Sequence, residues 1–145
     1  MRITAKSDYA MLALLHLGID KANRPVQSRT IAAKQQIPHR FLEQILLNLK
    51  KAGLVRSVRG AKGGYQLAVS PAEINLRDAI EAVEGGIHLL GNRENGATAV
   101  ESDRRLLQTV WVEIEQSFLE NLSSVTLEDI IARQQQQRDV LMYHI

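Results

Sequence analysis

Apolar residues recur every three to four positions in several stretches of the chain, which is the period of a helix with one buried face. Residues 7–19 form the first stretch, with Ser7 as a candidate N-cap, and residues 28–36 form a short second one capped by Ser28. Ile37-Pro38 then predicts a break and a new start. The clearest helix spans residues 38–53, with an expected buried stripe of Phe41, Leu42, Ile45, Leu46 and Leu49.

The pattern changes in "LVRSVRG" and "GYQLAV", which are rich in β-branched residues and separated by a glycine-rich turn, with Tyr65, Leu67 and Val69 alternating to one side of the second segment. Alternation of this kind predicts a β-hairpin. Three short helices followed by a hairpin is the order of a winged helix-turn-helix. A nucleotide-binding loop is disfavoured, because the glycine-rich turn is followed by a strand and no GxxxxGK[ST] string is present.

Helical periodicity returns after residue 75. Asn75 is a candidate cap for a helix that ends at Gly85 and Gly86, and residues 86–100 have no period. A long helix is expected over residues 101–121 and a last one from Thr126, with a tail from residue 133 that is expected to fray unless a partner holds it. The predicted fold is mainly α with a small β-hairpin, divided into residues 1–84, a loop at 85–100 and residues 101–145.

Charge separates the chain into two halves. Residues 1–75 carry twelve Lys and Arg against four Asp and Glu, a balance of +8, whereas residues 76–145 carry six against twelve, a balance of −6. A compact basic half is typical of a surface that binds a polyanion, although a solvated basic face without a partner has the same composition. No apolar run is long enough for a membrane span and no signal peptide is evident, so a cytoplasmic location and no membrane partner are expected.

In a winged helix-turn-helix the third helix reads DNA bases. Its predicted solvent face carries Arg40, Glu43, Gln44 and Leu47, of which we expect the first three to read bases. Glu43 can accept a hydrogen bond from cytosine N4, and Gln44 can pair with adenine. The alternative for Glu43 is an exposed ion pair with Arg40 or Lys50.

The turn of the hairpin places Arg59 and Lys62 among Gly60, Gly63 and Gly64. Small residues would let the turn enter a minor groove, where a guanidinium meets the strongest negative potential. The alternative is that the glycines only provide positive φ angles and the charges are solvated. Phosphate contacts are predicted for a wider set of polar residues, namely Arg2, Thr4, Lys6, Ser7, Ser28, His39, Lys50, Lys51 and Arg56.

Several segments together resemble the IscR/CymR-type winged-helix transcription regulators of bacteria: "MRITAKSDYAMLALLHLG", "FLEQIL" followed by "AGLV", "SVRG" and "GGYQLA", and the "DAIEAVEG" helix. The resemblance implies palindromic DNA operators, base recognition through Glu43 and Gln44, and a wing led by Arg59 and Gly60. It also implies a homodimer joined by the long helix near residues 101–121. The expected interface is the apolar face of that helix, with Leu107, Val110, Trp111, Ile114 and Phe118.

One family feature is missing. Many members bind an iron–sulfur cluster through three cysteines after the "VEG" segment, and this chain has no cysteine. Because such clusters require thiolate ligands, no cofactor is expected. His88, Glu94, Glu101 and Asp103 could form an oxygen-and-nitrogen metal site, with a solvated loop as the alternative, and no metal is predicted.

The sequence therefore predicts a sequence-specific, homodimeric DNA-binding transcription regulator that acts as a repressor. The alternative is a winged-helix interaction module that binds an enzyme partner, with the apolar tail "VLMYHI" as its contact. An enzyme is disfavoured, because no nucleophile with an adjacent base and no paired carboxylates can be assembled by spacing.

Overall fold

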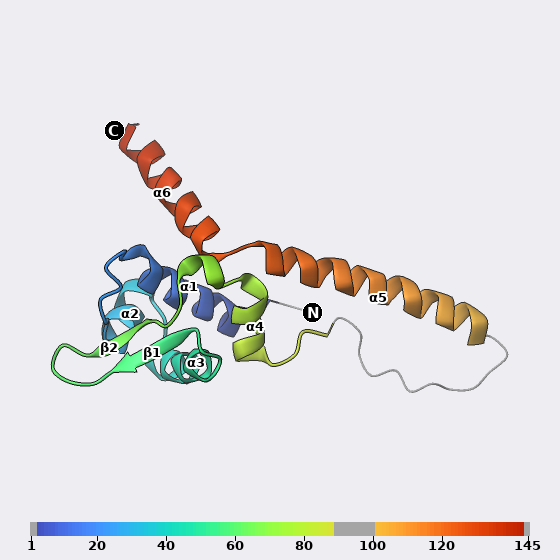
Figure 1. Ribbon diagram of the computed structural model, residues 1–145, viewed down its shortest axis with the longest axis horizontal. Helices are drawn as coiled ribbons and strands as arrows, with labels where there is room; N and C mark the ends of the chain where they lie inside the picture. Colours follow the sequence, from blue (N-terminus) through green and yellow to red (C-terminus); the bar gives the residue numbers. More distant parts are fainter. Residues whose placement is uncertain (1–2, 89–100, 144–145) are drawn as a thin grey trace.

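The structure is a computed structural model that describes residues 3–88 and 101–143. Within these residues four α-helices and a hairpin form one body, and two further α-helices extend from it in different directions (Figure 1). In chain order the elements are α1 (Ala5–Ile19), α2 (Ser28–Gln35), α3 (His39–Lys51), β1 (Val55–Val58), β2 (Gly64–Leu67), the short 3-10 helix η1 (Pro71–Glu73), α4 (Leu76–Glu84), α5 (Glu101–Ser124) and α6 (Leu127–Tyr143).

The core forms where α3 packs against α1. The buried face of α3 consists of Leu42, Ile45, Leu46 and Leu49, each at most 2% exposed. Burying one such side chain contributes about 1.5–3 kcal/mol to folding. From α1 this core receives Ala10, Ala13, Leu14 and Leu17. The third helix and the hairpin predicted from the sequence are both confirmed.

Phe41 was predicted to belong to the buried stripe of α3, and this was wrong. Its side chain is 44% exposed, and the Arg40 guanidinium carbon lies 5.1 Å from the centre of its ring. Position 41 lies at the edge of the buried stripe, about 100° round the helix from Leu42. The four residues that face α1 fill the contact without it.

The inward face of α1 was predicted only in part. Helical spacing gives the stripe Tyr9, Leu12, Ala13, Leu15, His16 and Ile19, of which Ala13 is fully buried. Leu12 and Leu15 are only half-buried, whereas Leu14 and Leu17, which lie outside that stripe, are buried. The physical reason is that α1 is apolar on most sides and contacts α2, α3, α4, α6 and β2, so its periodicity does not single out one face. Ser7 does not cap the helix, which begins earlier, at Ala5.

The other predicted caps fared differently. Ser28 is the first residue of α2, and Gln27 occupies the N-cap without a side-chain bond, so the predicted cap at Ser28 was wrong. Asn75 does cap α4, since its side chain accepts a hydrogen bond of 2.8 Å from the Asp78 amide. The tail after residue 133, predicted to fray, continues as helix α6 to Tyr143.

The hairpin is held to the body by the loop before α2. The two strands pair in antiparallel register from Val55 with Leu67 to Val58 with Gly64. Val26 adds a further bridge, because its N–H donates to the Tyr65 carbonyl and its carbonyl accepts from the Tyr65 N–H, both at 2.8 Å. The base of the hairpin is therefore fixed relative to α2.

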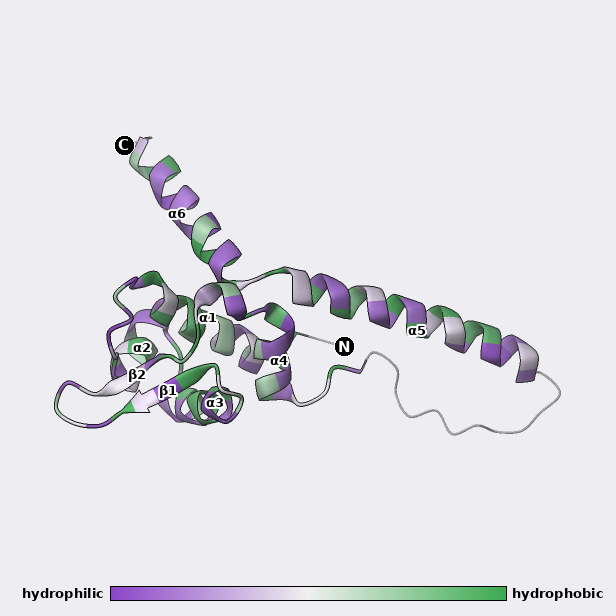
Figure 2. Ribbon diagram, viewed as in Figure 1, coloured by the Kyte–Doolittle hydropathy of each residue, from purple (hydrophilic) through white to green (hydrophobic). Residues whose placement is uncertain are grey.

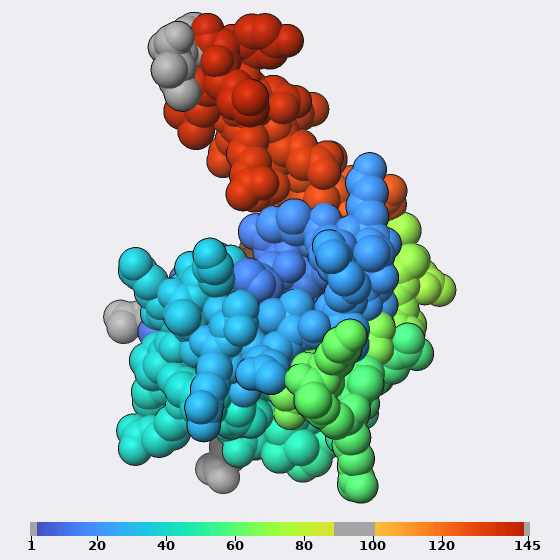
Figure 3. Space-filling model, turned by 90° about the vertical axis from the view of Figure 1, so that its left-hand side faces the viewer, coloured from blue at the N-terminus to red at the C-terminus, as the bar shows by residue number. Residues whose placement is uncertain are grey.

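The α5 and α6 helices each pack against this body over only part of their length. Leu119 of α5 packs against Ile80 and Ile87 in a small second cluster, and Leu127 at the start of α6 is 1% exposed in the main core. Gly18 lets α6 approach α1, since a Cβ there would lie 2.8 Å from Ile131. Beyond its first turns α6 stands clear of the body (Figure 3). None of the helices in the described ranges is long and apolar enough to cross a membrane.

Two adjacent leucines of α3 test this packing. Leu46 is fully buried, whereas Leu47 is 41% exposed on the opposite face. Leu46→Ala should lower the free energy of unfolding by about 2–5 kcal/mol, because it leaves a cavity in the core. Leu47→Ala removes the same atoms and should cost less than about 1 kcal/mol. Denaturant unfolding at one protein concentration measures both, and equal losses would contradict the assigned orientation of α3.

Candidate nucleic-acid interface

The exposed face of α3 presents polar and apolar side chains together. Arg40, Gln44, Leu47 and Lys51 follow one another at three-to-four-residue spacing, and all are exposed. The Gln44 amide nitrogen lies 3.4 Å from Asn48 Oδ1, a long hydrogen bond that leaves the rest of the amide group free to pair. With Phe41 beside Arg40, this face offers hydrogen-bonding groups and apolar contact for a thymine methyl.

Phe41 is a candidate contact that sequence reasoning missed. Its neighbour Arg40 was recognised as exposed, and the two side chains lie in cation–π contact. The signal was present in the pattern, because four other apolar residues already provide a complete inward stripe for α3.

Glu43 lies at the side of α3 that meets α2. The Ser28 hydroxyl donates a hydrogen bond of 2.6 Å to Glu43 Oε1, and His39 Nε2 lies 3.1 Å from the same oxygen. The side chain that contacts Glu43 on α3 is thus His39, where the sequence suggested an ion pair with Arg40 or Lys50. Burial raises the pKa of the Tyr65 phenol, and the negative charge of Glu43 adds to this effect. Glu43 therefore lies at the junction of α2, α3 and the hairpin.

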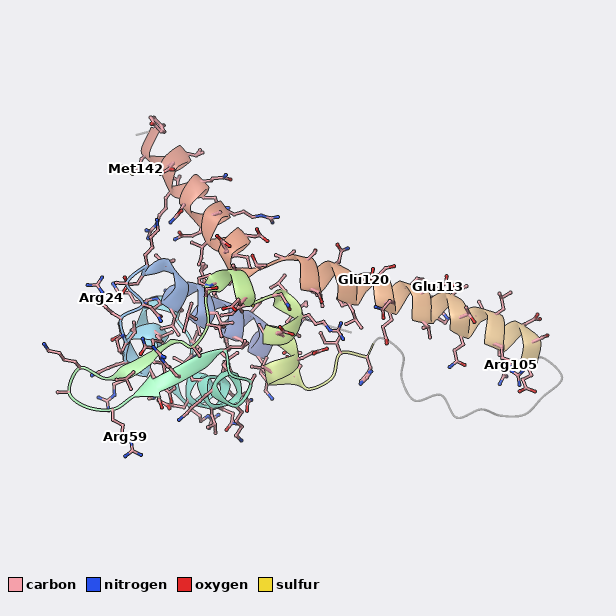
Figure 4. All side chains as sticks on the ribbon, viewed as in Figure 1. Arg24, Arg59, Arg105, Glu113, Glu120 and Met142 are labelled. Carbon is pink, nitrogen blue, oxygen red and sulfur yellow. The ribbon has the colours of Figure 1, made fainter. Side chains whose placement is uncertain are left out.

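The turn at residues 59–63 carries Arg59 and Lys62, both exposed. Arg59 points out from the hairpin, away from the rest of the protein (Figure 4). A Cβ at Gly63 would lie 2.2 Å from the Val58 carbonyl oxygen, and Gly60 has a φ of +110°. The turn itself thus requires these glycines. Entry of the turn into a minor groove stays a prediction.

The predicted phosphate contacts lie in different settings. Lys50 Nζ donates a hydrogen bond of 2.9 Å to the Ser57 hydroxyl, which links α3 to β1. Lys51 is exposed on the face of α3 that carries Arg40 and Gln44. Arg56 lies on the opposite face of β1 from Ser57, since neighbouring strand residues alternate. It lines a groove with Asp20 that is separate from the α3 surface.

The amino-terminal candidates are divided as well. Arg2 lies outside the described residues, and Lys6 is exposed on α1. Thr4 donates a hydrogen bond to Glu84 Oε1, and the Ser7 hydroxyl donates to the same oxygen at 3.1 Å. Ser7 is 2% exposed, so it does not reach a phosphate and that prediction was wrong.

The predicted dimer residues lie on α5, which extends away from the body (Figure 1). Leu107, Val110, Trp111 and Ile114 are 41–54% exposed. Phe118 is half-buried against the small cluster of Ile80, Ile87 and Leu119. Hydrophobic and hydrophilic residues alternate along the whole of α5 (Figure 2).

Residues 3–133 match the Rrf2 family, which is described as an iron-dependent transcriptional regulator. The chain belongs to the Rrf2 family. It is 30% identical to the HTH-type transcriptional regulator CymR of Bacillus subtilis over the full length of both chains. It is 34% identical to the regulator IscR of Pectobacterium carotovorum, over 90% of this chain and 79% of that one.

Solved structures of Rrf2 relatives have the same fold. IscR of T. potens superposes with a TM-score of 0.72 at 32% identity, covering 92% of this chain and 88% of that one. CymR of B. subtilis gives a TM-score of 0.72 at 31% identity, covering 92% and 98%. The predicted fold class and the family resemblance are confirmed, and this Rrf2 protein is a transcription regulator with a DNA-binding winged helix.

The Rrf2 family is described as iron-dependent, but this chain lacks the ligands for a cysteine-bound iron–sulfur cluster. The sequence of 145 residues holds no cysteine, and iron–sulfur clusters require thiolate ligands. Within residues 3–88 and 101–143 no group of three His, Asp or Glu side chains could hold a metal ion. Of the four residues considered as an alternative metal site, Glu94 lies outside the described residues.

A pair of glycine substitutions tests how the hairpin is held. Gly64 has a φ of +143°, and a Cβ there would lie 2.3 Å from the Val26 carbonyl oxygen. Gly64→Ala should displace Tyr65 from Val26 at a local cost of about 1–3 kcal/mol and speed hydrogen exchange of the Tyr65 amide.

Gly60→Ala is the matched control, because Gly60 also has a positive φ but open space around it. It should leave exchange at Tyr65 close to that of the unmodified protein. Equal acceleration in both variants would contradict the anchoring role of Val26.

Proposed function

We propose that this protein is a homodimeric, sequence-specific repressor that binds palindromic operators in double-stranded DNA. The observation that carries the proposal is the placement of α3. Its apolar face is buried against α1, so Arg40, Gln44 and Leu47 are exposed on the opposite face. This supports a role in base reading, because a winged helix reads DNA with the exposed face of this helix.

The dimensions of α3 suit this role. Its 13 residues span about 20 Å, enough to lie in a major groove. In this arrangement Gln44 pairs with adenine, and Glu43 accepts a hydrogen bond from cytosine. The hairpin lies beside α3, and Arg59 at its turn reaches the adjacent minor groove. Lys50 and Lys51, at the end of α3, neutralise phosphates.

The α5 helix supports the homodimer. Its large apolar side chains are exposed along a helix that, within residues 3–88 and 101–143, packs against α4 near its own carboxyl end. A second copy covering this face would remove those side chains from water, and two copies related by a twofold axis would read a palindrome. Repression follows from occupying the operator.

The alternative, a module whose main role is to bind an enzyme, is not favoured, because the relatives are named as transcriptional regulators. The exposed end of α6, with Val140, Leu141, Met142 and Tyr143, is the surface such a module would use. A DNA-binding regulator accounts for the α3 surface as well, and the interaction module does not.

Binding to a duplex selected from random DNA tests the reading surface. Arg59→Ala should weaken binding to the selected duplex by about 5- to 150-fold, equivalent to about 1–3 kcal/mol. Lys51→Ala should weaken binding to selected and random duplexes alike, and should lower the slope of log K against log salt by about one unit. Fluorescence anisotropy at several salt concentrations measures both effects.

The reading roles have their own control. Glu43→Ala and Gln44→Ala should weaken binding to the selected duplex more than binding to random DNA, because base contacts are lost. Equal losses on both kinds of DNA would contradict those roles.

The dimer is tested by two identical substitutions on opposite faces of α5. Val110 lies on the face that carries Trp111 and Ile114, whereas Val112 lies about 160° away round the helix. Val110→Asp should shift the protein toward monomer by placing a carboxylate in the interface, and Val112→Asp should not. Sedimentation velocity measures the mass, and a monomeric unmodified protein would refute the proposal.

A further inference from the structure

Three polar side chains from two helices meet beside the reading face of α3. Ser28 is the first residue of α2, and His39 and Glu43 lie one turn apart on α3. The Ser28 hydroxyl oxygen is 2.6 Å from Glu43 Oε1 and 3.0 Å from His39 Nε2, and His39 Nε2 is 3.1 Å from the same Glu43 oxygen. Each of the three groups therefore contacts the other two.

The hydrogen atoms in this cluster can be assigned from the chemistry of the groups. An ionised carboxylate only accepts, and Ser28 has a single hydroxyl proton, which the 2.6 Å distance assigns to Glu43. A lone pair on His39 Nε2 would then face two oxygens at close range. The His39 ring must therefore carry its proton on Nε2 and donate it to the cluster.

This assignment changes the role of Ser28 and His39. Both were predicted to contact phosphates, but the hydroxyl proton of Ser28 and the Nε2 proton of His39 are already donated within the cluster. Both donors act on Oε1 of Glu43, so the second carboxylate oxygen is the one left for a base. Two donors also hold the carboxylate in one orientation, which reduces the entropy lost on binding.

We propose that Ser28 and His39 are positioning residues that set base preference by holding Glu43 in the orientation in which it accepts from cytosine N4. The two donors also offset part of the cost of bringing a carboxylate among phosphates. This inference rests on the proposed function, in which Glu43 reads a base.

The first test uses Ser28→Ala and Ser28→Thr. Selection with the unmodified protein and with Glu43→Ala identifies the base pair that Glu43 reads. At that pair, Ser28→Ala should reduce the preference for the selected base by about fivefold, the effect of one lost hydrogen bond. Ser28→Thr keeps a hydroxyl and should retain the preference. In a Glu43→Ala background, Ser28→Ala should change the preference no further.

The second test uses His39→Leu and His39→Gln. Leucine has no donor and should reduce the same preference, whereas the glutamine amide can donate and should retain most of it. Circular dichroism establishes that each variant is folded, and the His39 pair supplies the test independently if Ser28→Ala unfolds.

The possible outcomes separate this inference from the proposed function. If the unmodified protein selects no sequence, the proposed function fails. The positioning role is refuted if the unmodified protein selects a sequence and Arg59→Ala weakens binding to it, while Ser28→Ala and His39→Leu keep the full preference for the base that Glu43 reads. It is also refuted if Ser28→Ala weakens all duplexes equally and lowers the salt slope, since that result indicates a phosphate contact.

Discussion

The burial of one face of α3 against α1 is the interaction on which the rest of the structure depends. That face consists of Leu42, Ile45, Leu46 and Leu49, which are shielded from water. Rotation of the helix about its axis would expose them, so its orientation is fixed. The opposite face is thereby directed outward. The bond between Lys50 and Ser57 and the bridge between Val26 and Tyr65 then hold the hairpin beside α3. Core packing thus determines which side chains DNA would meet.

The elements predicted well from the sequence are those with one strong local pattern. The α3 helix has a single apolar stripe, and the hairpin alternates on both sides of a glycine turn. The inward face of α1 was not predictable in this way, because several elements surround that helix. The Glu43 cluster was missed for another reason. The His39 contact is visible as an i,i+4 pair, but the Ser28 contact joins residues 15 positions apart and depends on how α2 packs against α3.

The charge division of the chain runs close to a structural division. The basic residues 1–75 contain α1 to α3 and the hairpin, and the acidic residues 76–145 contain α4, which packs in the body, together with α5 and α6. A negative carboxyl half is repelled by phosphates, which favours contact with DNA through the amino half. The chain has the fold of the Rrf2 family, but without cysteine it cannot ligate an iron–sulfur cluster through thiolates.

Site-specific photo-crosslinking tests the central claim most directly. A photoreactive amino acid placed at position 44 on α3 or at position 59 in the hairpin turn should crosslink to the selected duplex, because both positions face the grooves. The same group at position 133, on the exposed side of α6, should not. Crosslinks from position 133 together with none from positions 44 and 59 would contradict the account.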